Sequence, residues 1–139
     1  MKKLLCILFI LLSATFAFST EIKDEIVCEH TFDFEPSIKV AKLWISEAFT
    51  SGKNVVDFYD EDLKVLTGIA SSKYKDEYVY TYNFKFKISI KKNTVKVVFN
   101  NMTAGTMKLP ITPSHACVDE FYNDLETLAK SLFKYYEEF

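Results

Sequence analysis

Apolar residues occupy every second position of one long segment of the chain. They are Tyr78, Tyr80, Tyr82, Phe84, Phe86, Ile88 and Ile90, and the positions between them are mostly polar. A period of two is the pleat of a β-strand, so one face of this strand is predicted to be buried and the other exposed. The pattern is typical of an antiparallel sheet that is covered on one side only.

The same alternation resumes after Lys92-Asn93, which suits a two-residue hairpin turn because asparagine tolerates the left-handed conformation. This turn predicts a register for the two strands. On the buried side the facing pairs are Ile90–Val95, Ile88–Val97 and Phe86–Phe99. On the other side they are Ser89–Lys96, Lys87–Val98 and Lys85–Asn100.

Three further segments have strand patterns: 26–34, 53–59 and 63–74. The acidic turn Asp60-Glu61-Asp62 joins the last two; it lacks the spaced oxygen ligands of a calcium loop and is interpreted as a solvated turn. The facing of 63–74 has two solutions. Either Val65 and Ile69 point inward, or Leu66, Gly68 and Ala70 do, with the small residues making room for aromatic neighbours.

Helical spacing of apolar residues predicts two helices. Pro36 and Ser37 suit the start of the first, and Gly52 suits its end. The second runs from about Ser114 to Glu138 with one apolar stripe along its length. Residues 101–113 are predicted to be irregular and to pack along the sheet edge. The fold class is therefore α+β: a two-layer sandwich in which two helices cover one face of a five-stranded antiparallel sheet, in the order strand, helix, four strands, helix.

The first 19 residues have the pattern of a signal peptide. Lys2 and Lys3 precede an apolar run, and small residues up to Ser19 predict cleavage before Thr20. The run is short for a membrane span, and no second one follows it. We expect an exported protein, periplasmic or extracellular, with no membrane span after cleavage and with residues 20–139 forming one domain.

The basic residues of the chain are all lysine, 17 against 19 acidic residues. The whole chain has a net charge of −2, and loss of Lys2 and Lys3 makes it −4. Arginine supplies the bidentate contacts that recognise phosphates and bases, so its absence and the negative charge argue against nucleic-acid binding.

Three blocks of residues carry a resemblance to a known family. They are Phe32-Asp33-Phe34 leading into Ala41-Lys42-Leu43-Trp44-Ile45, the strand Val65–Ala70, and Phe84–Ile90 followed by Lys96–Phe99. In these blocks the chain resembles an exported bacterial domain of unknown function with the TBP-like fold, the fold of one repeat of the TATA-box-binding protein. The resemblance implies that fold and an envelope location. It implies no catalytic residue.

Two cysteines remain after cleavage, and each has a histidine two positions away: Cys28 with His30, and Cys117 with His115. Because the second helix should cover the face that carries Cys28 and His30, all four side chains could meet. An oxidising compartment favours a Cys28–Cys117 disulfide; two separate buried thiols are the alternative. A zinc site is chemically allowed, although the spacing is unlike that of common zinc modules. No cofactor motif is found, and the sequence predicts no cofactor.

The uncovered sheet face is the candidate partner-binding surface, by analogy with the sheet face of the TATA-box-binding protein. Its central residues are Thr81, Asn83, Lys85, Lys87 and Lys96, and it is predicted to mix charges and to lack intercalating aromatics. We expect a non-catalytic binding domain whose partner is a protein, peptide or glycan of the envelope. The alternative is a small metal-binding protein or enzyme that uses Cys28, His30, His115 and Cys117.

Overall fold

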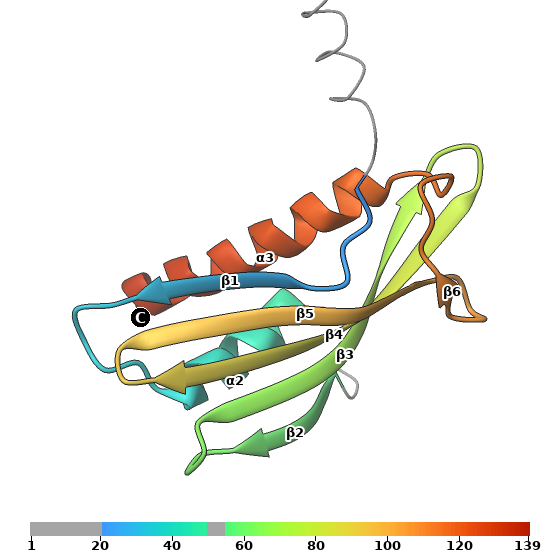
Figure 1. Cartoon of the computed structure of the whole chain (residues 1–139). Coiled ribbons are helices and arrows are strands. Elements are labelled where there is room, and N and C mark those ends of the chain that lie inside the picture. The colour runs from blue at the N-terminus through green and yellow to red at the C-terminus, as the bar shows by residue number, and fades with distance from the viewer. Residues whose placement is uncertain (1–20, 50–54) are drawn as a thin grey trace, which may run out of the picture.

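The structure, a computed structural model, describes residues 21–49 and 55–139. In these ranges the elements in chain order are β1 (Ile26–Thr31), α2 (Ile38–Ala48), β2 (Val56–Asp60), β3 (Val65–Lys75), β4 (Val79–Lys91), β5 (Thr94–Ala104), β6 (Leu109–Pro110) and α3 (Val118–Glu138), shown in Figure 1. The predicted signal peptide, the helix stop at Gly52 and the strand start at residue 53 lie outside the described residues.

The strands form one antiparallel sheet in the order β1-β5-β4-β3-β2, and the short β6 pairs with the far end of β5. The predicted register of the central hairpin is confirmed, with Phe86 opposite Phe99 and Ile88 opposite Val97. The turn differs in one respect. The positive φ of 56° belongs to Lys92 and not to Asn93, which excludes a type I′ turn because both of its central residues have positive φ.

Both helices cover the same face of the sheet, α2 over β3 and β4 and α3 over β1 and β5 (Figure 1). Ser37 caps α2 as predicted, since its hydroxyl accepts from the backbone N–H of Lys39. The core between the layers is aromatic: the Phe121 ring of α3 stacks on Tyr82 of β4 with ring centroids 4.9 Å apart. Within the described residues, no helix has the combination of length and apolarity needed to cross a membrane.

The facing of β3 follows the second of the two predicted solutions. Leu66 is fully buried, whereas Ile69 is 44% exposed on the opposite face. Gly68 is on the same buried side as Leu66. There the Phe86 ring and the Val55 carbonyl occupy the space that a β-carbon would need. A small residue therefore makes room for an aromatic neighbour, as the pattern indicated.

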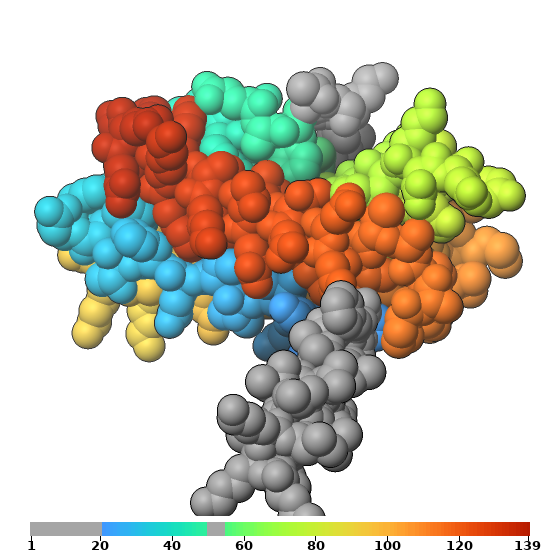
Figure 2. Space-filling view, turned by 90° about the horizontal axis from the view of Figure 1, so that it is seen from above, coloured from blue at the N-terminus to red at the C-terminus, as the bar shows by residue number. Residues whose placement is uncertain are grey.

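Three element ends differ from the sequence predictions. Strand β1 stops at Thr31 rather than residue 34, because its partner β5 begins at Thr94. Tyr78, predicted to be buried, is 71% exposed, since the β3–β4 turn projects beyond the two helices (Figure 2). Residues 101–104 are not irregular: β5 continues through a bulge at Asn101, where φ is 48°, and regains pairing with β4.

The last predicted helix begins four residues later than expected, at Val118 instead of about Ser114. Cys117 has the left-handed φ of 64° at its start, and the preceding residues form turns in which His115 bonds to Thr112. The predicted apolar stripe is confirmed. Leu128 of the predicted stripe is partly buried, and the other predicted residues are buried: Val118, Phe121, Tyr122, Leu125, Ala129, Leu132 and Tyr136.

Candidate binding face

The open face is the side of the sheet turned away from α2 and α3, and three lysines lie at its centre. Lys85 and Lys87 come from β4 and Lys96 comes from β5. They face outward because the alternate positions of both strands fill the core. The sequence prediction that these side chains share the uncovered face agrees with the register of the hairpin.

The neighbours of the three lysines are mostly neutral. Lys85 lies between Ile69 and Asn100, and Lys87 lies between Thr67 and Val98. Within the described residues, neither lysine has an ion pair, and neither has Lys96, which faces Glu29 across the β1–β5 pair. All three ammonium groups are therefore exposed and outside any ion pair of the described chain, and Lys96 alone has a carboxylate, that of Glu29, on the facing residue.

Thr81 and Asn83 have structural partners. The Asn83 amide donates to the Gly105 carbonyl at 2.8 Å and to the Thr103 hydroxyl at 3.3 Å. The Gly105 N–H in turn donates to the Thr81 carbonyl at 2.8 Å. Both residues thus hold the turn that follows β5, where Gly105 has a φ of 76°. Of the five predicted face residues, Asn83 uses its side-chain amide within the fold and Thr81 uses its backbone carbonyl, whereas the three lysine ammonium groups have no ion pair among the described residues.

Apolar side chains also lie on the open face, in addition to Val98, which the predicted register placed there. Val27 and Ile69 are 45% and 44% exposed, and Phe58 is 48% exposed at the edge strand β2. The face was predicted to lack intercalating aromatics, and Phe58 is an exposed aromatic residue at its β2 edge. A bulge between Val56 and Phe58 shifts the register of β2, so its facing could not be read from alternation. The outward position of Val27 could have been found from the alternation within the predicted strand 26–34.

The four residues of the alternative site do not gather at one place, because Cys28 and His30 lie beside different parts of α3 while His115 and Cys117 precede its first residue. The Cys28 thiol interacts with Glu126 and Lys130 near the middle of the helix, and His30 lies 3.6 Å from Glu137 near its end. Cys117 starts the helix. A rise of about 1.5 Å per residue puts Glu126 roughly 13 Å from Cys117 along the axis, whereas bridged cysteines have Cα atoms within about 7 Å.

Accordingly, Cys28 and Cys117 are both free thiols, and the fold does not bring the predicted disulfide together. Among the described residues, no group of three or more His, Cys, Asp or Glu side chains is arranged to hold a metal ion. Burial and then Glu126 raise the pKa of Cys28. Burial, Glu120 and Asp76 raise the pKa of Cys117. Both shifts oppose formation of the thiolate that a nucleophilic cysteine needs.

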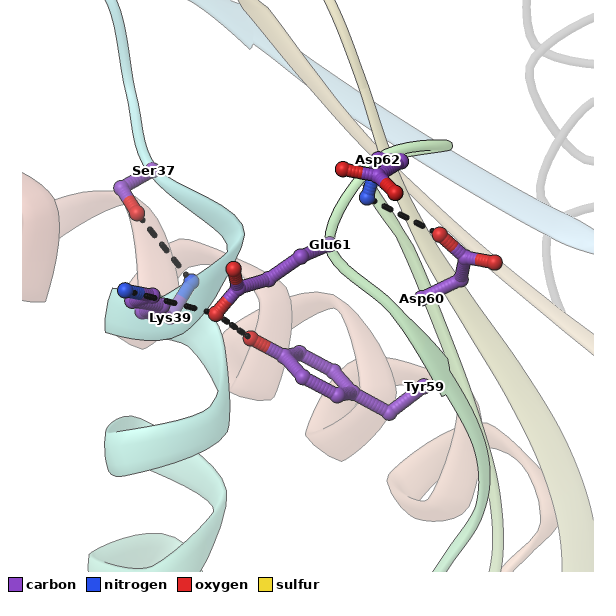
Figure 3. Close-up of polar contacts among 6 residues, drawn as sticks. All are labelled: Ser37, Lys39, Tyr59, Asp60, Glu61 and Asp62. Carbon is purple, nitrogen blue, oxygen red and sulfur yellow. Dashed lines mark hydrogen bonds and ion pairs between the residues drawn. The ribbon is translucent and has the colours of Figure 1, made fainter.

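The acidic turn between β2 and β3 uses its oxygens internally, as Figure 3 shows. The Asp60 carboxylate accepts from the backbone N–H groups of Asp62 and Leu63, both at 2.9 Å. Glu61 accepts from the Tyr59 hydroxyl and pairs with Lys39 of α2 at 3.4 Å. These contacts fix the turn against the start of α2, and they use the carboxylates of Asp60 and Glu61.

Comparison with known proteins yields structural neighbours only. No family model matches the chain, and no curated protein matches it. A DUF4468 family protein from Bacteroides ovatus has 12% identity and a TM-score of 0.55 over 83% of this chain and 90% of its own. A TBP-like protein from Parabacteroides distasonis has 8% identity and a TM-score of 0.59 over 86% of this chain and 97% of its own.

At such identities the likeness concerns the fold alone. Both neighbours are matched over nearly their full length, so the whole arrangement of sheet and helices corresponds and not one motif of it. The strand order and the two helices on one face agree with the architecture that the sequence predicted. The chain is an α+β protein with the TBP-like fold, similar to a DUF4468 family protein and to a TBP-like protein of Bacteroides and Parabacteroides.

Proposed function

We propose that the protein is a non-catalytic binding domain of the bacterial envelope that binds an acidic partner through its open face. The observation that carries the proposal is the group of Lys85, Lys87 and Lys96, three exposed ammonium groups with no ion pair among the described residues. The notion of an envelope location comes from the leader pattern at residues 1–19.

The distribution of charge supports an acidic partner. The chain has a net negative charge, yet lysines gather at the centre of the open face. Acidic residues at the β2 edge of that face are engaged: the Thr67 hydroxyl donates to Asp57, and Asp60 accepts from its own turn. The lysines attract anions to the centre of the face, although the molecule as a whole carries a net negative charge.

The apolar neighbours give the face a second means of contact. Ile69 lies beside Lys85, and Val98 lies between Lys87 and Val27 across the strands. Lysine stems pack along such apolar surface while the ammonium groups stay in water. A partner that presents carboxylate, phosphate or sulfate groups on a partly apolar surface would bury these apolar side chains and contact the lysine ammonium groups at the same time.

The test uses two defined polyanions, poly-glutamate as the peptide probe and heparin as the glycan probe. Binding of each to the purified protein is measured by fluorescence anisotropy at two salt concentrations. The variant Lys85→Glu with Lys87→Glu should weaken binding about tenfold, because two attractions of a few tenths of a kcal/mol become repulsions. Higher salt should weaken binding by the wild-type protein.

The matched control is Lys130→Glu with Lys134→Glu, which makes the same charge change on the exposed side of α3. It should alter binding by less than about threefold, since only the long-range charge changes. The proposal fails if both probes bind equally to the wild type and the open-face variant while circular dichroism shows both folded. It also fails if the helix variant loses as much binding as the open-face variant.

A further inference from the structure

A hollow of about 560 Å³ lies at one end of the open face, where β1 ends and β4 turns into β5. The place can be followed in Figure 1 from the tip of the β1 arrow to the β4–β5 turn. The volume is in the range of small-molecule sites. Its lining residues are all polar or charged: Glu29, Thr31, Ser89, Lys91, Lys92, Thr94 and Lys96.

Three kinds of chemistry meet in this hollow. Lys91, Lys92 and Lys96 supply cations, and within the described residues none of them has an ion pair. The Thr31 and Thr94 hydroxyls bond to each other at 2.8 Å, which leaves one hydroxyl hydrogen and several lone pairs for a ligand. The lining thus offers both donors and acceptors beside its positive charge.

The Glu29 carboxylate distinguishes the hollow from a plain anion site. It faces Lys96 across the β1–β5 pair, so it stands among the cations and only accepts hydrogen bonds. A bare phosphate or a run of acidic side chains would be repelled by it. A ligand that carries hydroxyl donors next to its anionic group satisfies Glu29 and the lysines together.

We propose that this hollow binds an anionic sugar, with its phosphate, sulfate or carboxylate on the lysines and its ring hydroxyls on Glu29, Thr31 and Thr94. The inference rests on the proposed function, because the hollow belongs to the same open face, and it names the ligand class. Lysine suits such a ligand, since an ammonium group is a compact point charge that needs no bidentate geometry. No aromatic ring lines the hollow, so recognition is by charge and hydrogen bonds.

The probes are glucose 6-phosphate, glucuronate, inorganic phosphate and glucose, titrated into the full-length protein by calorimetry. At least one of the two sugar anions should bind about tenfold more tightly than phosphate and than glucose. Lys92→Gln with Lys96→Gln should weaken that binding about tenfold, at roughly threefold for each exposed charge contact. The matched control, Lys130→Gln with Lys134→Gln on α3, removes the same charge outside the open face and should change binding less than about twofold.

Glu29→Ala separates the sugar from the anion. Phosphate should bind the variant more tightly, because a repelling carboxylate is gone, while the advantage of the sugar anion over phosphate should fall to about twofold or less. The inference is overturned if neither sugar anion binds saturably, if phosphate binds as tightly as both of them, or if a tetraglutamate peptide competes equally well. It is also overturned if the Lys130 and Lys134 control loses as much binding as the hollow variant.

These outcomes separate the two proposals. If poly-glutamate or heparin requires Lys85 and Lys87 while no sugar anion binds, the hollow is refuted and the open-face function stands. If a sugar anion requires Lys92 and Lys96 while neither polyanion depends on Lys85 and Lys87, the wider partner surface is refuted and binding is confined to the hollow.

Discussion

Gly68 on β3 gives the sharpest stability prediction, because its surroundings decide whether replacing it by alanine stabilises or destabilises the protein. In Gly68→Ala the new β-carbon would lie 2.3 Å from Cζ of Phe86 and 2.5 Å from the Val55 carbonyl oxygen. Ordinary contact between such atoms needs about 3.5–4.0 Å. Where space allows, glycine to alanine stabilises a protein by about 0.4–1 kcal/mol, so a loss of stability must come from this contact.

Neither neighbour of Gly68 can move away freely. The Phe86 ring is 3% exposed and stacks on Phe49 with centroids 6.0 Å apart. The Val55 carbonyl accepts from the Ile69 N–H at 2.8 Å, so displacing it weakens a backbone hydrogen bond worth about 1 kcal/mol. Together with overpacking of about 1–3 kcal/mol, less the gain from the unfolded chain, we expect a net loss of about 2–3 kcal/mol and a fall in Tm of roughly 8–12 °C.

Urea and thermal unfolding by circular dichroism measure this loss, with Ser71→Ala as the control on the exposed side of the same strand. That control should stay within about 0.5 kcal/mol of the wild type. In the double variant Gly68→Ala with Phe86→Leu a smaller side chain replaces the ring. Its free energy of unfolding should be higher by about 1 kcal/mol or more than the sum of the two single changes predicts. A Gly68→Ala protein as stable as the wild type, or more stable, would refute the close-packed geometry.

Three other outcomes are expected. Tyr136→Phe should lower the free energy of unfolding by about 1–2 kcal/mol, because the buried hydroxyl donates to the Ser37 carbonyl at 2.7 Å; an unchanged urea midpoint would contradict this bond. Burial raises the pKa of Tyr82 to about 12 and raises that of Tyr136 as well. The stabilisation from keeping these hydroxyls neutral is complete below about pH 10, where unfolded tyrosine is still neutral, and is lost as the pH rises to about 12. The urea midpoint should therefore drop between about pH 10 and pH 12. Alkylation of the unfolded protein without reductant should label both Cys28 and Cys117 by peptide mass, and a cross-linked peptide would contradict their separation along α3.

The central hairpin and both helices could be predicted from the sequence because local rules determine them. Alternation set the buried side of β4, the two-residue turn set its register with β5, and Ser37 marked the start of α2. The errors fall where a distant partner decides. Tyr78 follows the alternation, yet it is exposed because neither helix reaches the end of the hairpin.

The candidate site shows the same division. The three lysines of the open face followed from alternation, whereas the hollow near Lys92 needed the pairing of β1 with β5, which joins Glu29 to Lys96 although they are far apart in the sequence. The Cys–His cluster was a spacing argument, and it failed because two residues on a strand and two at a helix start share a face without sharing a position along the helix. A sequence pattern shows which side of a strand or helix a residue is on more readily than it shows where along the neighbouring element that residue packs.

The position of β1 at the sheet edge affects the order in which the fold can be completed. Strands β2 to β5 form a meander in which each strand pairs with the next one along the chain, so their contacts close short loops. Strand β1 is synthesised first, but its partner lies beyond all of them, with Ile26 opposite Phe99. The N-terminal strand must therefore wait, unpaired, until the last long strand has emerged. We infer that β1 joins a preformed meander, and that its amide protons exchange with solvent before those of β4.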